Sequence, residues 1–253
     1  MTHYVIALAV FLCVFGSALI GLYLRHKLPE HHLGDDSVSV VKLATGLIAT
    51  LAALVLSLLI SSAKATYDTT ASEVIHNAAM VIHLDRDLAR YGPQTNAVRT
   101  LLKHNYAQAV DILESGESAT LSLLGGPQAI ARSETLQAAI EALTPANPSQ
   151  QNAKAQSLQL VDQIFAARWL VLLQVQGSIP MPLLMVLVAW LSTIFGCFGL
   201  FAKANGTVMV ALLMCALSVA AAVFMIEEMS RPLDGLVKVS VAPMRNTLER
   251  MGQ

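Results

Sequence analysis

The sequence predicts an all-α membrane protein with four spanning helices and a helical extramembrane segment between the second and third spans. Its 253 residues are 55% hydrophobic and only 13% charged, and the mean hydropathy of +0.59 lies above that of soluble domains. Four runs are long and apolar enough to cross a hydrocarbon core, at about residues 4–24, 43–61, 183–202 and 207–226. The residues between the second and third runs are more polar and have helical periodicity.

The second apolar run, residues 43–61, holds no charge and lies between Lys42 and Lys64. At about 100° per residue, one side of this helix carries small and hydroxyl residues, with one isoleucine at its far end. These candidate pore-lining residues are Gly46, Ala49, Thr50, Ala53, Ser57, Ile60 and Ser61. The opposite side suits lipid and consists of Leu47, Ile48, Leu51, Val55, Leu58 and Leu59. A single lipid-dissolved anchor has no need of this sorting, so we expect a homo-oligomer that hides the small side.

The other spans also carry small residues, which allow helices to approach closely. In the first span the stripe includes Ser17 and Gly21, and we expect it to pack against the second span. The third span has Gly196 and Gly199, and the fourth has Ala211 and a further small-residue stripe. These two spans are predicted to form a tight hairpin.

The extramembrane segment is predicted to hold four helices. Apolar residues recur every three or four positions from 66 to 91, continuing the second span without a break until Gly92-Pro93. Further helices are expected at about 94–115 and 128–143, and from Pro148 onward with Asn147 as the N-cap. The predicted domains are a first transmembrane hairpin (1–62), a helical domain (63–180), a second hairpin (181–228) and a C-terminal tail (229–253).

Charged residues gather at the predicted membrane boundary. Lys64 and Asp68 continue the line of the small stripe, and a polar cluster follows the fourth span: Glu227, Glu228, Arg231 and Asp234. This cluster either anchors the helix end at the interface or lines the mouth of a conduit. Asp85 lies on the apolar side of its helix, so we expect a basic group on another helix to pair with it.

The sequence offers no basis for an enzyme or for a cofactor. It has no phosphate loop, GxSxG elbow, HExxH pair or dinucleotide fingerprint. His83 and Asp87 have the spacing of a metal pair, but two ligands are too few, and the adjacent His31 and His32 point in different directions. We therefore expect no metal. A net charge of −1 indicates no binding of nucleic acid.

Several segments, in order along the chain, resemble the bacterial bestrophin-like domain family, a former domain of unknown function that is distantly similar to bestrophin anion channels. They are RHKLPE (25–30), HLGDDS (32–37), the second span (46–59), LDR (84–86), YGP (91–93), RPLDGL (231–236) and VS (239–240). The resemblance implies a pentamer, a pore lined by the second span and a cytosolic helical vestibule. Large apolar side chains ring the bestrophin neck, whereas the stripe here is small. The acidic run of calcium-activated bestrophins is also reduced here to three residues, so the resemblance does not extend to calcium gating.

The sequence thus favours an oligomeric channel for inorganic ions in the lipid bilayer. The alternative is a non-conducting, membrane-anchored helical module that senses a ligand or acts as a scaffold. Lysines and arginines flank the spans on both sides, so charge does not decide the orientation. The resemblance indicates the bacterial cytoplasmic membrane, with both termini and residues 62–180 in the cytosol.

Overall fold

The structure is a computed structural model that describes residues 2–28, 35–116, 118–175, 181–203 and 205–252, and every regular element in these ranges is a helix. The all-α prediction is therefore confirmed. Four helices are long and apolar enough to span a membrane: α1 (Thr2–Lys27), α2 (Asp35–Tyr91), α7 (Met181–Phe201) and α8 (Gly206–Met229). The chain divides into two compact units. Unit 1 contains α1, α2 up to Ala65, α7 and α8, and unit 2 contains the remaining helices.

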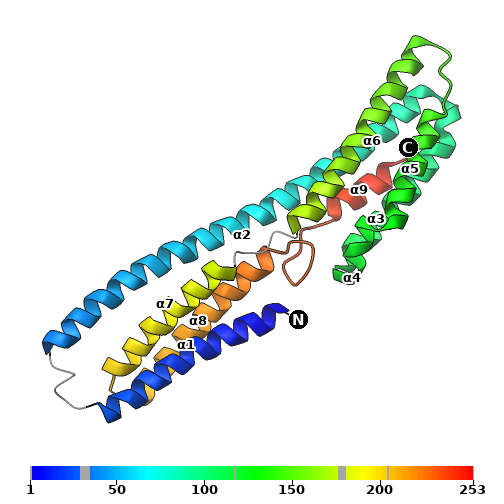
Figure 1. Cartoon of the computed structure of the whole chain (residues 1–253). Coiled ribbons are helices and arrows are strands. Elements are labelled where there is room, and N and C mark those ends of the chain that lie inside the picture. Colours follow the sequence, from blue (N-terminus) through cyan, green and yellow to red (C-terminus); the bar gives the residue numbers. More distant parts are fainter. Residues whose placement is uncertain (1, 29–34, 117, 176–180, 204, 253) are drawn as a thin grey trace. The chain divides into compact units, whose positions relative to one another are not determined.

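Helix α2 is continuous over 57 residues, as the unbroken periodicity predicts (Figure 1). At about 1.5 Å per residue it is about 85 Å long, well beyond the thickness of a hydrocarbon core. It ends at Tyr91 because Gly92 has a positive φ of 130° and Pro93 cannot continue the hydrogen-bond ladder. The Thr95 hydroxyl then donates a 2.8 Å hydrogen bond to the Gly92 carbonyl oxygen.

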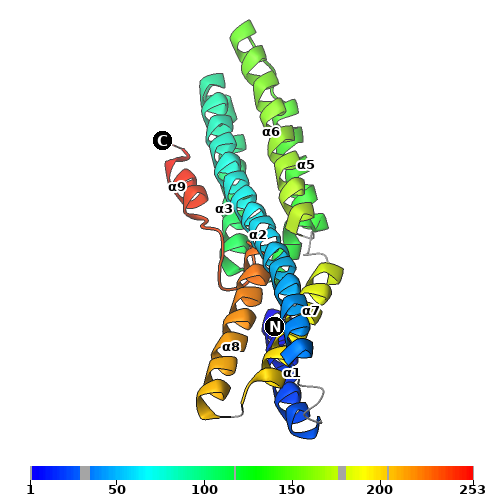
Figure 2. The same ribbon diagram turned by 90° about the vertical axis from the view of Figure 1, so that its left-hand side faces the viewer.

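In unit 1, α1 packs against both α7 and α8, which make few direct contacts with each other within the described residues (Figure 2). The crossing of α1 and α7 brings two backbones together. A Cβ atom on Gly21 would overlap the Gly196 carbonyl oxygen, and one on Gly199 would overlap the carbonyl oxygen of Ala18. Glycine at these positions is therefore required by space, and the contact depends on it.

Two packing expectations were wrong. The small stripe of α1 packs at Gly21 against α7 instead of α2, and α1 lies between α7 and α8, which form no tight hairpin. In α8, Ala211 and Cys215 are exposed. A small-residue stripe indicates that some helix can approach it, but all four spans carry such a stripe, so the pattern does not select the partner.

Unit 2 is a bundle whose core joins α2 to the helices that follow it. These elements are η2 (Pro93–Thr95), α3 (Asn96–Ser115), α4 (Ser118–Leu121), η3 (Ser122–Gly125), α5 (Pro127–Glu141), α6 (Pro148–Val175) and α9 (Ala242–Arg250). The predicted N-cap of α6 is confirmed, since the Asn147 Oδ1 accepts a 2.9 Å hydrogen bond from the Gln150 amide. The sequence does not predict α4 and α9. Helix α9 packs on α3, and Met244 and Met251 are buried in the core.

The prediction that a basic group on another helix pairs with Asp85 of α2 is confirmed. Asp85 is 1% exposed, and the Arg99 guanidinium of α3 donates two hydrogen bonds to its carboxylate at 2.8 and 2.9 Å. The Gly252 amide donates to the same carboxylate at 3.3 Å. One buried charge therefore holds α2, α3 and the end of the chain together.

The α1–α7 contact predicts different outcomes for two glycines on the same helix. Replacing Gly21 with Ala should lower the thermal unfolding midpoint, because the added methyl group must separate the two backbones at a cost of about 1–3 kcal/mol. Gly16→Ala is the matched control, since a Cβ there meets no atom within 4 Å. Circular dichroism of detergent-solubilised protein measures both. Equal midpoints for the two variants would contradict the close contact.

Two arginine–carboxylate pairs of unit 2 should differ in how much they contribute to the free energy of unfolding. Arg99→Met leaves the Asp85 carboxylate buried and unpaired, so we expect a loss of about 3–5 kcal/mol in the free energy of unfolding. Arg245→Met breaks an ion pair with Glu114 in which the Arg245 side chain is 60% exposed, and it should cost less than about 1 kcal/mol. The midpoint of thermal or denaturant unfolding reports both. A larger loss from Arg245→Met would refute this ranking.

Candidate functional site

Within unit 1, the spanning part of α2 has three faces. One face packs against the other spanning helices and consists of Thr45, Ile48, Ala52, Val55, Leu56, Leu59 and Ala63. The second face is bulky, apolar and exposed, and it consists of Leu43, Leu47, Leu51, Leu54 and Leu58. The third is the small stripe. At about 100° per residue, the small face lies roughly 130° from the buried face in one direction and the leucine face roughly 140° in the other. The small and leucine faces are therefore adjacent, about 90° apart.

The chain's own packing leaves the small stripe almost entirely uncovered. Ala49 is half-buried, and the other candidate lining residues, Gly46, Thr50, Ala53, Ser57, Ile60 and Ser61, are exposed. The Thr50 hydroxyl donates a 2.9 Å hydrogen bond to the Gly46 carbonyl oxygen. Because this hydroxyl is satisfied within the helix, the stripe is distinguished mainly by its lack of bulk.

The expected lipid side of α2 needs a correction. Leu47, Leu51 and Leu58 are exposed, but Leu59 is buried and Ile48 and Val55 pack against the core of unit 1. A helical wheel cannot separate these two groups, because lipid and a neighbouring helix both favour apolar side chains.

A cavity of about 590 Å³ lies beside one end of the stripe. Its lining comes from α2, α7 and α8 and includes Lys42, Gly46, Ala49, Phe198 and Val208. The lining is mostly apolar, with an exposed lysine at the end of the span. The small stripe therefore continues into a hollow of unit 1.

The charged residues proposed for a pore mouth have different environments. Lys64 and Asp68 are exposed on α2. By contrast, Glu227 and Glu228 are 7% and 1% exposed at the end of α8. Arg231 and Asp234 are half-buried. The two glutamates thus have the burial of structural groups, whereas Lys64 and Asp68 are accessible from solvent.

The described residues contain no group of three or more His, Cys, Asp or Glu side chains that could hold a metal ion. His83 lies 3.6 Å from the Asp87 carboxylate, and Arg90 lies 3.1 Å from the same carboxylate. The pair with metal spacing is thus part of an ion-pair cluster on α2. His31 and His32 lie outside the described residues.

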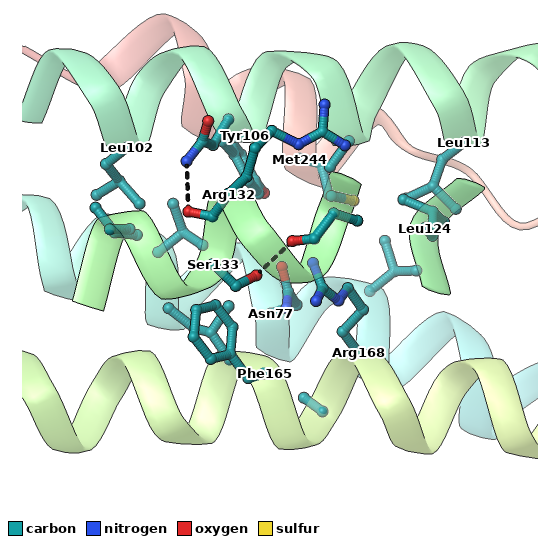
Figure 3. Close-up of a pocket in the computed structure, with 18 of the residues that line it drawn as sticks. Asn77, Leu102, Tyr106, Leu113, Leu124, Arg132, Ser133, Phe165, Arg168 and Met244 are labelled. Carbon is teal, nitrogen blue, oxygen red and sulfur yellow. Dashed lines mark hydrogen bonds between the residues drawn. The ribbon is translucent and has the colours of Figure 1, made fainter. Parts of the chain in front are cut away.

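Unit 2 contains a second cavity, of about 130 Å³, between α2, α3, α5, α6 and α9 (Figure 3). Most of its lining is apolar, including Leu102, Leu136 and Phe165. Arg132 and Arg168 also line it, together with the buried Tyr106. The sequence does not predict this site, because its residues come from five α-helices and from η3 and form no local motif.

The family model described as Bestrophin-like domain matches residues 12–244, nearly the whole chain. The protein belongs to the Bestrophin-like family. No curated protein and no solved structure gives a significant match.

Family membership and the four apolar helices make this bestrophin-like chain a membrane protein related to bestrophins. The family match runs from within α1 to Met244 in α9. It therefore includes most of α1, the other three spanning helices and most of the bundle of unit 2. The resemblance identified from short segments is confirmed over both units.

Proposed function

We propose that this bestrophin-like protein is a homo-oligomeric ion channel whose pore is lined by the small face of α2. One observation carries the proposal: among the described residues, the chain covers one face of α2, offers leucines to lipid on a second, and leaves the third, small face exposed except at Ala49. A ring of subunits would bring this third face to its axis once per subunit. The family resemblance supports a pentamer.

The length of the stripe favours lining over simple packing. A helix crossing needs small residues over about two turns, whereas Gly46 to Ser61 covers about four turns. A narrow pore also excludes bulky side chains along its whole length, and the exposed residues of this face meet that requirement up to Ile60. The proposed lining residues are those of the stripe defined above.

The charges at the ends of the stripe favour anions as the permeant ions. Lys42 and Lys64 flank it, and no acidic residue lies between them. Both lysines are exposed and lie on the same side of the helix as the stripe, at about 100° per residue. Positive charge at a pore end raises the local concentration of anions, and Lys42 supplies it at one end. At the other end Asp68 offsets Lys64, so the preference for anions rests on Lys42 and on the resemblance to bestrophin anion channels. Asp68 is one turn further along α2.

We place the protein in the bacterial cytoplasmic membrane, with both termini and residues 62–180 in the cytosol, by resemblance to the family. The proposal includes no enzymatic activity and no cofactor. A reporter enzyme active only in the periplasm, fused near Ser133, should remain inactive. Activity of that fusion would place unit 2 on the opposite side of the membrane.

A non-conducting sensor or scaffold is the second candidate, and the cavity of unit 2 favours a ligand-sensing role. The two candidates differ in whether the purified oligomer passes current. They are not distinguished by family membership, which both share.

Recording from purified protein in planar bilayers tests the channel directly. Ala53→Phe should abolish or strongly reduce the current without dispersing the oligomer, because a phenyl ring on each subunit would fill the pore axis. Leu54→Phe is the matched control, since Leu54 is on the leucine face and is 64% exposed, and it should leave the current unchanged. A salt gradient should give a reversal potential that indicates anion selectivity.

Size-exclusion chromatography with light scattering supplies the oligomeric state of each variant. If Ala53→Phe dissociates the assembly and the parent protein passes no current, the stripe is a packing surface. The non-conducting function would then replace the channel.

A further inference from the structure

The cavity of unit 2 has the size and lining of a site for a small, mostly apolar molecule. Its volume is about 130 Å³, close to the roughly 150 Å³ of an apolar protein cavity that binds benzene. Apolar side chains form most of the wall, among them Leu102, Leu136 and Phe165. Such a site accepts one ring or a short chain, with specificity supplied by the few polar groups present.

Two of those polar groups are buried without a hydrogen-bond partner in the part of the chain that the structure describes. Tyr106 is 6% exposed and its hydroxyl oxygen has no partner. The Nε of Arg168 is likewise buried and unpaired. Native structures rarely leave buried donors unpaired, because each costs free energy. Both residues line the cavity, so a ligand there could accept their hydrogen bonds.

The surroundings of Arg168 favour the binding of an anion. Its guanidinium carbon lies 5.6 Å from the centre of the Phe165 ring. Burial lowers the pKa of Arg168, and the positive charge of Arg132 lowers it further. The folded protein thus disfavours the positive charge that Arg168 carries at neutral pH, and a bound anion would stabilise that charge. Burial also raises the pKa of Tyr106, which keeps its hydroxyl a donor.

The net charge of the lining selects a monoanion. Among the described residues of its lining, the charged ones are Arg132, Arg168 and Glu73, which leaves one net positive charge. The Arg132 guanidinium bonds to the neutral Gln108 side-chain oxygen, so this contact does not neutralise its charge. A carboxylate accepts hydrogen bonds from a guanidinium and a hydroxyl at once.

We propose that this cavity binds a small carboxylate with an apolar body, its carboxylate held by Arg168 and Tyr106 and its body by the apolar wall. The ligand class is a monocarboxylic acid of about the size of benzoate. This binding does not depend on the channel function, since the cavity lies wholly within unit 2. It would supply the ligand site that a sensing role requires.

Isothermal titration of the full-length protein in detergent with benzoate, benzamide and phenyl phosphate tests the proposal. Benzoate should bind at least about tenfold more tightly than benzamide, which has the same shape without the charge. Phenyl phosphate, a dianion near neutral pH, should bind more weakly than benzoate. Failure of benzoate to bind at millimolar concentration, equal binding of benzamide, or tighter binding of phenyl phosphate would overturn the carboxylate assignment.

Variants separate ligand binding from a structural role. Arg168→Met should weaken benzoate binding by at least about tenfold while leaving the unfolding midpoint of the ligand-free protein equal or higher, because it removes a buried N–H that has no hydrogen-bond partner. Tyr106→Phe should weaken binding several-fold and preserve the fold. Arg250→Met, at an exposed residue of α9, is the matched control and should change neither property. Unchanged benzoate affinity in both Arg168→Met and Tyr106→Phe would overturn the site.

Discussion

The structure depends on how the circumference of α2 is divided inside the membrane. A spanning helix satisfies its backbone internally, so its side chains alone decide what it contacts. The chain buries one face, at residues such as Ala52 and Leu59, and the leucine face suits lipid. The face from Gly46 to Ser61 suits neither role. Its side chains are smaller than those that usually face lipid, and the stripe is longer than a single helix crossing requires. This face is the physical basis of the proposed assembly around an axis.

Each unit contains a contact that tolerates little change. In unit 1 the close approach of α1 and α7 depends on Gly21 and Gly199, since any side chain there would meet backbone. In unit 2 the buried Asp85 joins α2, α3 and the end of the chain through Arg99 and Gly252. These two contacts thus fix which helices pack together, which the hydrophobic pattern alone does not determine.

The sequence predicts the elements of this fold better than their partners. The apolar runs predict the four spanning helices, and Gly92 predicts the end of α2, because length, polarity and backbone restriction are local properties. The apolar pattern does not distinguish Val55, which packs, from Leu54, which is exposed. Asp85 signals that it needs a partner, but only the structure identifies Arg99. The cavity at Arg168 is assembled from five α-helices and η3 and has no sequence signature.

Cysteine accessibility along α2 tests the central claim most directly. In a variant with Cys13, Cys197 and Cys215 replaced by alanine, single cysteines at positions 53 and 57 should react with a membrane-impermeant thiol reagent in the bilayer, and positions 54 and 58 should not. Water reaches the small face only if it lines a conduit, whereas lipid excludes the reagent from the leucine face. Protection of both faces, with the oligomer intact, would contradict a water-filled pore lined by α2.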